Sequence, residues 1–536
     1  MTTTTTAAAL PSSEGGPRVR FAPGAEELRS HLASILARGA DSRPLKDNAV
    51  RTVFSAAAPP PFRGVVVKLY KRPDAATRLK QAIVGRPYDR EWRGLERVAA
   101  AGIAAPRALA IGESGGRPFL VTEEIANART ASALLRETRD RSERREILDG
   151  LARIAAALVR ARLFHRDLHT GNFLRGDDGV LRVLDLHTLL RVPAVLRDFA
   201  AGRSLARLVQ SLLELATRTE RMRFVRAFAA AAGAADAARR LYFAAERDAR
   251  SLEWRRIKSR TRRCVLKSTE FWVERLEGAR LFYRRSFGSE AALAAVRAHE
   301  RADGPLVLKN GRRTKVTRVE AGGKAVCVKE HRVRGLRDRA RNLVWRGRAR
   351  NEWMAGHALE VLKLDTPRTL ALLEGKGRRS SYVVTELKPA LRELDRSIHE
   401  EWAPGTPPSR RRPLIRLAAA LVATLHARRL YHNDLKAKNL LLGRRADGAP
   451  ALWIIDLTGV RVGRRFTERR RRKNLAQLDT SLPPEATAAD RMRFLALYLR
   501  LLRSREDRRA LARAVRRAGA GRVNYWKAGR DPLTSS

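Results

Sequence analysis

His165-Arg166-Asp167-Leu168-His169-Thr170-Gly171-Asn172 is the stretch that decides the fold, and its pattern returns at 432–439 as His-Asn-Asp-Leu-Lys-Ala-Lys-Asn. In both copies Asn follows Asp by five residues. An apolar run ending in aspartate follows each copy, 18 residues after the first loop aspartate and 22 after the second. A single His-x-Asp-Leu is common by chance, so its meaning depends on whether the surrounding sequence repeats in step.

Matching segments occur in the same order in both halves of the chain. Lys68 and Lys329 each end an apolar run and are 261 residues apart. The separation has grown to only 271 residues at Asp185 and Asp456. Insertions in the loops of the second half would produce such a small, steady increase in the separation of matching residues. The chain is therefore a duplication of a unit of roughly 265 residues, enough for one domain of two lobes.

Both copies carry the groups that phosphoryl transfer from ATP requires. That reaction needs cations on the phosphates, oxygen ligands for Mg²⁺ and a group that orients the acceptor hydroxyl. In a loop of this pattern the aspartate, Asp167 or Asp434, accepts the proton of the acceptor. Lys436, two residues after Asp434, is placed to reach the transferred phosphoryl group. The predicted metal ligands are Asn172, Asp185, Asn439 and Asp456.

The cations expected on the nucleotide are Lys68 and Lys329. Each has a glutamate 23 residues later in a predicted helix, Glu91 and Glu352, as a candidate ion-pair partner. Taken singly, a lysine in a strand or a glutamate on a helix is usually a solvated surface charge. The ordered set, present twice at matched spacing, favours a functional site.

Glu123 and Glu386 end the strand that should lead into the hinge between the lobes, where we expect adenine to bind. The loop over the phosphates is the weak element, because neither half contains Gly-x-Gly-x-x-Gly. We place residues 56–61 there in the first half. In the second half we expect Ala321-Gly322-Gly323 in this place, as a hairpin turn.

The periodicities predict an α+β fold, with tandem bilobal kinase-like domains that each have a small β-rich lobe before a helical lobe. Expected helices span 88–101, 147–162, 289–302, 349–361 and 414–428, with strands at 118–124 and 381–387 and a hairpin within 264–284. The expected domains are a disordered tail (1–16), a first kinase-like domain (17–250), a connecting hairpin and helix (251–302) and a second kinase-like domain (303–536).

Three segments resemble the lipopolysaccharide kinase family, the Kdo/heptose kinases of Gram-negative bacteria, within the protein-kinase-like superfamily. They are residues 165–174, Asp185-Leu186-His187, and 474–478 with 490–495. The resemblance covers both halves, hence two tandem copies. It implies ATP and Mg²⁺ as cofactors and phosphorylation of a sugar hydroxyl of an anionic glycolipid. It also implies peripheral contact with the inner face of the inner membrane.

Other acceptors stay open. Asp167-Leu168-His169 with Gly171-Asn172 is also similar to small-molecule phosphotransferases of the aminoglycoside and choline type. Lys436 after Asp434 is more typical of a protein kinase loop. The alternative is therefore a protein or small-molecule kinase on the same fold, with one unit as a regulatory pseudokinase.

Composition limits the other classes of function. The net charge of +54 suits an anionic partner but also fits coding bias, because Arg far outnumbers Lys. Aromatic residues are only 6% and do not interleave with the basic runs, which disfavours nucleic-acid binding. The two cysteines exclude a disulfide framework and indicate a reducing compartment. With no signal peptide or apolar run of about 18 residues, we expect the cytoplasm.

Overall fold

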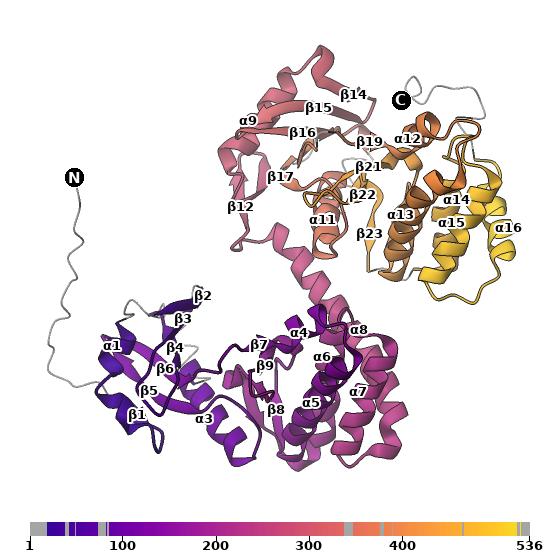
Figure 1. The fold of residues 1–536 in the computed structure, drawn as a ribbon. Coiled ribbons are helices and arrows are strands. Elements are labelled where there is room, and N and C mark those ends of the chain that lie inside the picture. Colours follow the sequence, from indigo (N-terminus) through magenta and orange to yellow (C-terminus); the bar gives the residue numbers. More distant parts are fainter. Residues whose placement is uncertain are drawn as a thin grey trace. The chain divides into compact units, whose positions relative to one another are not determined.

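The computed structural model describes residues 19–37, 42–48, 50–72, 82, 85–336, 347–375, 380–388, 390–463, 466–522 and 526. The predicted tail, 1–16, lies outside these residues. The chain divides into two compact units, Met1–Glu253 and Trp254–Ser536, and each has a β-rich lobe followed by a helical lobe (Figure 1). The fold is thus the predicted tandem of bilobal kinase-like domains.

The small lobe of the first unit is one antiparallel sheet in the order β1-β5-β6-β4-β3-β2. Its strands are β1 (Val19–Phe21), β2 (Arg43–Asp47), β3 (Arg51–Ala56), β4 (Val65–Tyr70), β5 (Ala108–Ser114) and β6 (Arg117–Glu123), with α1 (Leu32–Leu36) and α3 (Pro87–Ala100). The helix expected at 88–101 and the strand expected at 118–124 are confirmed. The inner face of the sheet is apolar, with Phe54, Val65 and Val67 fully or almost fully buried.

Pairing of β3 with β4 fixes which side chains share a face of the sheet. Val53 lies opposite Lys68, and Arg51 lies opposite Tyr70. Because side chains alternate along a strand, Arg51, Lys68 and Tyr70 share one face of the sheet. Val67, on the other face, belongs to the core.

The helical lobe of the first unit follows β6. Its elements are β7 (Arg129–Thr130), α4 (Ala131–Glu137), α5 (Arg141–Arg160), β8 (Leu163–His165), β9 (Phe173–Arg175), β10 (Leu181–Val183), β11 (Leu189–Arg191), α6 (Arg197–Leu212), α7 (Arg218–Ala231) and α8 (Ala238–Arg262). Asp140 caps α5 by accepting from the backbone of Ser142 and Glu143. α5 buries one apolar stripe and holds the short hairpins that carry the loop at 165–172.

The second unit repeats this design with one more strand. Its sheet has the order β12-β13-β17-β18-β16-β15-β14. The strands are β12 (Phe271–Leu276), β13 (Ala279–Arg284), β14 (Val307–Asn310), β15 (Thr314–Ala321), β16 (Lys324–His331), β17 (Thr369–Gly375) and β18 (Ser381–Glu386), with α9 (Ser289–Arg301) and α11 (Arg348–Val361). The predicted hairpin and helix within 251–302 form, and they are part of this lobe.

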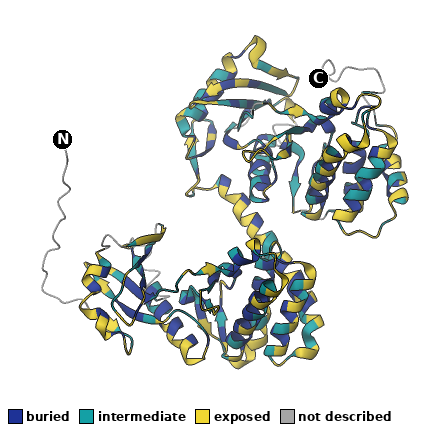
Figure 2. Ribbon diagram, in the orientation of Figure 1, coloured by how far each residue is buried: buried dark blue, intermediate teal, exposed yellow. Residues whose placement is uncertain are grey.

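The second helical lobe follows β18. Its elements are β19 (Arg392–Glu393), α12 (Leu394–Glu401), α13 (Pro408–Ala427), β20 (Leu430–Tyr431), β21 (Leu440–Arg444), β22 (Pro450–Ile454), β23 (Arg461–Val462), α14 (Glu468–Asp479), α15 (Ala488–Leu501) and α16 (Arg508–Gly519). Buried residues gather where the helices of each lobe pack on one another, and exposed residues cover their outer faces (Figure 2).

Two negative findings hold for the described residues. None of their helices combines the length and the apolar character that a bilayer crossing needs. Cys264 and Cys327 are both free, as the sequence predicts, and burial raises the pKa of the Cys327 thiol to about 11. Neither thiol is therefore disposed to ionise near neutral pH.

Candidate active site

The first unit brings its predicted lysine and glutamate together. Lys68, on β4, forms an ion pair with Glu91, on α3. The side chain of Glu91 is only 2% exposed, and it also accepts a hydrogen bond from the Tyr70 hydroxyl at 3.3 Å. A buried carboxylate needs such partners, because an unpaired charge in this environment would be very costly.

Asp185 lies beside this ion pair, two residues after the end of β10. It adopts the left-handed backbone conformation (φ 56°), which is costly for a residue other than glycine and which clusters at functional sites. Lys68 Nζ is 3.5 Å from one of its carboxylate oxygens, and Arg51 donates to the same oxygen at 2.9 Å. Burial alone would raise the pKa of Asp185, but the charges of Lys68 and Arg51 outweigh burial and lower this pKa to about 2.

Arg51 is a site residue that the sequence analysis missed. Its side chain is only 13% exposed, and it also approaches Glu91 at 3.5 Å. Arg51 lies opposite Tyr70 in the register of β3 with β4, and Tyr70 lies two residues after Lys68, so Arg51 and Lys68 share one face of the sheet. Arg51 can therefore be recognised as a site residue only once this pairing is known.

The loop 165–172 is held in a defined shape. His165 is buried; its Nδ1 accepts from the Asp167 backbone N–H at 3.2 Å and its Nε2 donates to the Leu184 carbonyl at 3.1 Å. Burial lowers the pKa of His165, in keeping with a neutral ring. The Asn172 amide donates to the Asp167 carbonyl at 2.8 Å, which leaves the amide oxygen of Asn172 available as a ligand.

His169 stands two residues after Asp167, where the second unit has a lysine. Its Nδ1 accepts from the Gly171 backbone N–H at 3.1 Å, so the proton of the neutral ring resides on Nε2. That Nε2 lies 3.8 Å from a carboxylate oxygen of Asp167. The first unit therefore has a donor beside its loop aspartate, which the sequence analysis did not identify as a site residue.

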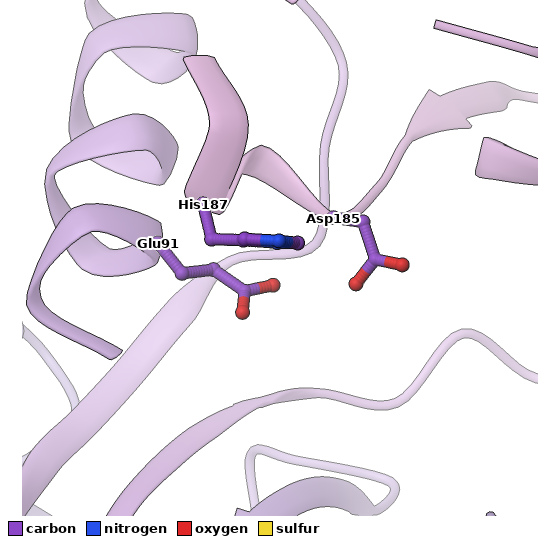
Figure 3. A group of neighbouring side chains, drawn as sticks. All are labelled: Glu91, Asp185 and His187. Atoms are coloured by element: carbon purple, nitrogen blue, oxygen red, sulfur yellow. The ribbon is translucent and has the colours of Figure 1, made fainter. Parts of the chain in front are cut away.

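Three side chains of the first unit could hold a metal ion together. Ligand atoms of Glu91, Asp185 and His187 all lie within 4.8 Å of one another (Figure 3). Nδ1 of His187 is buried and has no hydrogen-bond partner among the described residues, and burial lowers the pKa of this histidine. The carboxylate of Asp185 and the amide oxygen of Asn172 are the hard oxygen donors that Mg²⁺ prefers. The carboxylates of Glu91 and Asp185 in this cluster thus fit the predicted metal, and Asn172 stays a predicted ligand.

The second unit assembles the equivalent group. Lys329 Nζ lies 3.2 Å from Glu352 and 2.8 Å from Asp456, which also has a left-handed backbone (φ 54°). His331 contacts Glu352 at 2.8 Å, in the place that Tyr70 takes in the first unit. Burial would raise the pKa of Glu352, but Lys329 and His331 lower it to about 2.

The loop 432–439 repeats the shape of the first. His432 contacts the Ile455 carbonyl at 3.2 Å, and the Asn439 amide donates to the Asp434 carbonyl at 2.8 Å. Lys436 Nζ lies 3.2 Å from Asp434, and its contact with a transferred phosphoryl group stays a prediction. Burial lowers the pKa of His432, which is thus kept neutral like His165.

The two hinge glutamates end their strands as expected. Glu123 is the last residue of β6 and its backbone N–H donates to the Arg107 carbonyl, whereas Glu386 ends β18 and its carboxylate pairs with Lys388 at 3.1 Å. In each sheet the strand that ends in this glutamate is hydrogen-bonded directly to the lysine strand. Their contact with adenine stays a prediction.

The position of the phosphate-covering loops stays a prediction. The turns at 57–64 and at Gly322-Gly323 join the lysine strand to its neighbour, and the second of them is the expected hairpin turn. The turn next to the lysine, glutamate and aspartate is the preceding one, between β2 and β3, because Arg51 at its end touches Asp185. The corresponding turn in the second unit lies between β14 and β15 and holds Gly311-Arg312-Arg313.

The sheet order and the two lysine–glutamate–aspartate groups, each beside its His-x-Asp loop, define a protein of the kinase-like class with two candidate sites. The model of the lipopolysaccharide kinase (Kdo/WaaP) family matches residues 77–228 and 304–498, more than half of the chain. The chain belongs to this family.

Individual relatives match parts of the chain. It is 32% identical over 155 residues to the lipopolysaccharide core heptose(I) kinase WaaP of Pseudomonas aeruginosa, which is 26% of this chain and 58% of that protein. A structure of WaaP in complex with acyl carrier protein matches 44% of this chain and 99% of its own, at 23% identity and a TM-score of 0.34. WbdD with a kinase inhibitor matches 35% of this chain and 44% of its own, at 22% identity and a TM-score of 0.27.

Proposed function

We propose that both units transfer the γ-phosphoryl group of ATP to a hydroxyl group, and that the acceptor is a core sugar, Kdo or heptose, of a lipopolysaccharide. The observation that carries this proposal is the double occurrence of a buried lysine–glutamate pair in contact with a left-handed aspartate, in a chain of the lipopolysaccharide kinase family. The proposed location of the enzyme is the cytoplasm, at the inner face of the inner membrane.

Each site residue has a role in this proposal. Lys68 and Lys329 bind the α- and β-phosphates, and the buried glutamates hold these lysines in position. Mg²⁺, when bound, neutralises the charge of the phosphates. Its ligands are Asp185 and Asn172 in the first unit and Asp456 and Asn439 in the second.

The chemical step uses the loop aspartates. The acceptor oxygen attacks the γ-phosphorus, the bond from that phosphorus to the oxygen of ADP breaks, and Asp167 or Asp434 takes the acceptor proton. His169 in the first unit and Lys436 in the second supply a donor next to that aspartate. Such a donor stabilises the charge on the moving phosphoryl group.

One observation favours a second candidate function for the first unit. Arg51 occupies the Asp185 carboxylate, and a guanidinium there opposes metal binding. The first unit would then be a regulatory pseudokinase. The alternative of a protein or small-molecule acceptor uses the same site residues.

The test is turnover of Mg²⁺·ATP with a lipopolysaccharide extract by the unaltered chain, Asp167→Ala, Asp434→Ala and the double variant. If both units are kinases, each single variant keeps part of the rate and the double variant loses it. If Asp167→Ala changes nothing while Asp434→Ala abolishes turnover, the first unit is a pseudokinase. Absence of turnover and of ATP binding in all four proteins would refute the proposal.

A further inference from the structure

Four residues of the first unit form a stripe along α6 that leads to the catalytic loop. Phe199, Arg203, Arg207 and Ser211 are spaced four apart, so they lie on one face of the helix. Ser211 Oγ accepts a hydrogen bond from the Thr170 backbone N–H at 3.1 Å, three residues after Asp167. This hydrogen bond holds the stripe-bearing face of α6 against the catalytic loop.

Neither arginine of this stripe forms an ion pair with a carboxylate in the described part of the chain. Nε of Arg207 is buried and makes no hydrogen bond to any described residue. Burial lowers the pKa of Arg207, and the neighbouring charges of Arg203 and Arg166 lower it further, while Asp167 acts in the opposite sense. Arg207 is thus within reach of the charges of two further arginines and one carboxylate, an arrangement that an added anion would stabilise.

The start of the stripe is apolar and exposed. Val195 is 86% exposed and Phe199 67%, and Leu190 and Leu196, close to them in the sequence, are also exposed. The guanidinium of Arg203 lies over the Phe199 ring, 5.8 Å from its centre. An apolar patch that passes into a cationic cluster suits an amphipathic anion rather than a small soluble one.

We propose that Arg166, Arg203 and Arg207 form an anion subsite that binds a phosphate or carboxylate group of the acceptor, with the lipid portion on the patch of Leu190, Val195, Leu196 and Phe199. Guanidinium groups bind phosphate and carboxylate through paired hydrogen bonds, which suits this role. The subsite rests on the proposed function, since it orients the acceptor hydroxyl toward Asp167.

The second unit lacks this subsite. The positions of Arg166 and Arg207 hold Asn433 and Gln477, and Gln477 Nε2 is bound to the Asn433 carbonyl. Lys473, in the place of Arg203, donates to the Asn433 side chain at 3.5 Å. The two units therefore differ in the acceptor they take, and the first prefers the more anionic one.

The test compares two double variants of the full chain that remove the same charge. Arg203→Gln/Arg207→Gln alters the subsite, and Arg223→Gln/Arg226→Gln alters exposed arginines on α7. Binding is measured to lipopolysaccharide micelles before and after phosphatase treatment, and Mg²⁺·ATP binding is measured in parallel. Arg203→Lys/Arg207→Lys retains the charges and is expected to restore part of the binding.

We expect the subsite variant to bind untreated micelles about tenfold more weakly than the α7 variant, the effect of one lost charge-assisted hydrogen bond. If phosphatase treatment removes this difference, the bound anion is a phosphate; if the difference persists, it is a carboxylate. Equal binding by the two variants, or weaker Mg²⁺·ATP binding by the subsite variant, overturns the proposal. Because micelle binding needs no turnover, it decides the subsite even if the kinase activity is absent.

Discussion

Arg51 donates a hydrogen bond to Asp185 at 2.9 Å, so a guanidinium occupies the carboxylate that is proposed to bind Mg²⁺ in the first unit. In the second unit Lys329 contacts Asp456 at 2.8 Å, but no arginine of the described residues does, because the register of its sheet puts Thr314 opposite His331 where Arg51 lies opposite Tyr70. The two sites therefore share the types of their proposed catalytic residues and differ in the cations that contact the aspartate proposed as a metal ligand.

Replacing Arg51 with Thr should ease metal binding in the first unit. In an Asp434→Ala background, where only the first unit turns over, we expect the half-saturating Mg²⁺ concentration to fall severalfold, because a cation no longer competes for Asp185. The measurement is the rate as a function of Mg²⁺ at saturating ATP. The reverse change, Thr314→Arg with Asp167→Ala, should raise the Mg²⁺ requirement. An increased requirement in Arg51→Thr would show that Arg51 serves the nucleotide instead.

Loss of the site lysine should destabilise the second unit more than the first. Lys329→Met leaves Glu352 buried with His331 and Thr458, and breaking a buried ion pair costs about 3–5 kcal/mol. Lys68→Met costs less, because Arg51 still supplies a permanent charge to Glu91. Hydrogen exchange of the amides in α3 and α11 measures both effects in one experiment. Equal loss of protection in the two helices would contradict this assignment of partners.

The repeat in the sequence predicted the fold and indicated most residues of the candidate site, because these residues occur in short local sequence patterns. The loop asparagines and aspartates lie at fixed spacing, and each lysine ends an apolar strand, so local sequence places them. Local sequence could not predict that Arg51 belongs to the candidate site, nor that the turn between β2 and β3 lies next to Asp185. Both depend on which strands pair, and pairing is set by packing across the whole sheet.

His169 illustrates a different limit. The motif gave Lys436 a role because lysine is a cation in any setting, whereas a histidine acts through whichever nitrogen carries the proton. Only the hydrogen bond from Gly171 to Nδ1 shows that Nε2 is the donor that faces Asp167. The backbone conformation of the loop, which places the Gly171 N–H against Nδ1, was therefore needed to recognise His169 as a candidate site residue.

Removal of His169 should slow the chemical step in the first unit. With Asp434→Ala as background, we expect His169→Ala to lower kcat by about 10- to 100-fold and to leave the KM for ATP nearly unchanged, since the lost donor acts on the developing charge. His169→Lys should recover much of the rate, because the second unit uses lysine there. Steady-state kinetics decides between this outcome and a structural role, in which lysine would not rescue.

Gly94 should tolerate no side chain, although glycine is unfavourable inside a helix. A Cβ at this position of α3 would lie 2.7 Å from the Leu186 carbonyl oxygen, next to Asp185. Gly94→Ala is expected to shift Asp185 and lower the rate of the first unit by up to about 100-fold, as a displacement of about 1 Å can do. Gly202→Ala on α6 is the matched control, because nothing lies within 4 Å of its Cβ. Similar rates for the two variants would refute the role of Gly94.

Acid should destabilise the second unit through His426. This buried histidine contacts the Tyr498 hydroxyl at 2.6 Å, and burial, aided by Arg471, lowers its pKa to about 3. In the unfolded chain the pKa is about 6.5, so between these values the unfolded state holds one proton more. The free energy of unfolding should therefore fall by about 1.4 kcal/mol per pH unit from this group as the pH drops from about 6.5 to about 3.

His426→Gln should remove that contribution, so its unfolding free energy is expected to depend less steeply on pH than that of the unaltered chain over this range. Urea unfolding followed by tryptophan fluorescence reports mainly on the second unit, which contains seven of the eight tryptophans. Above pH 6.5 the group contributes no pH dependence in either protein, because the histidine is neutral in both states. Parallel curves between pH 4 and pH 6 would show that His426 is protonated in the folded state.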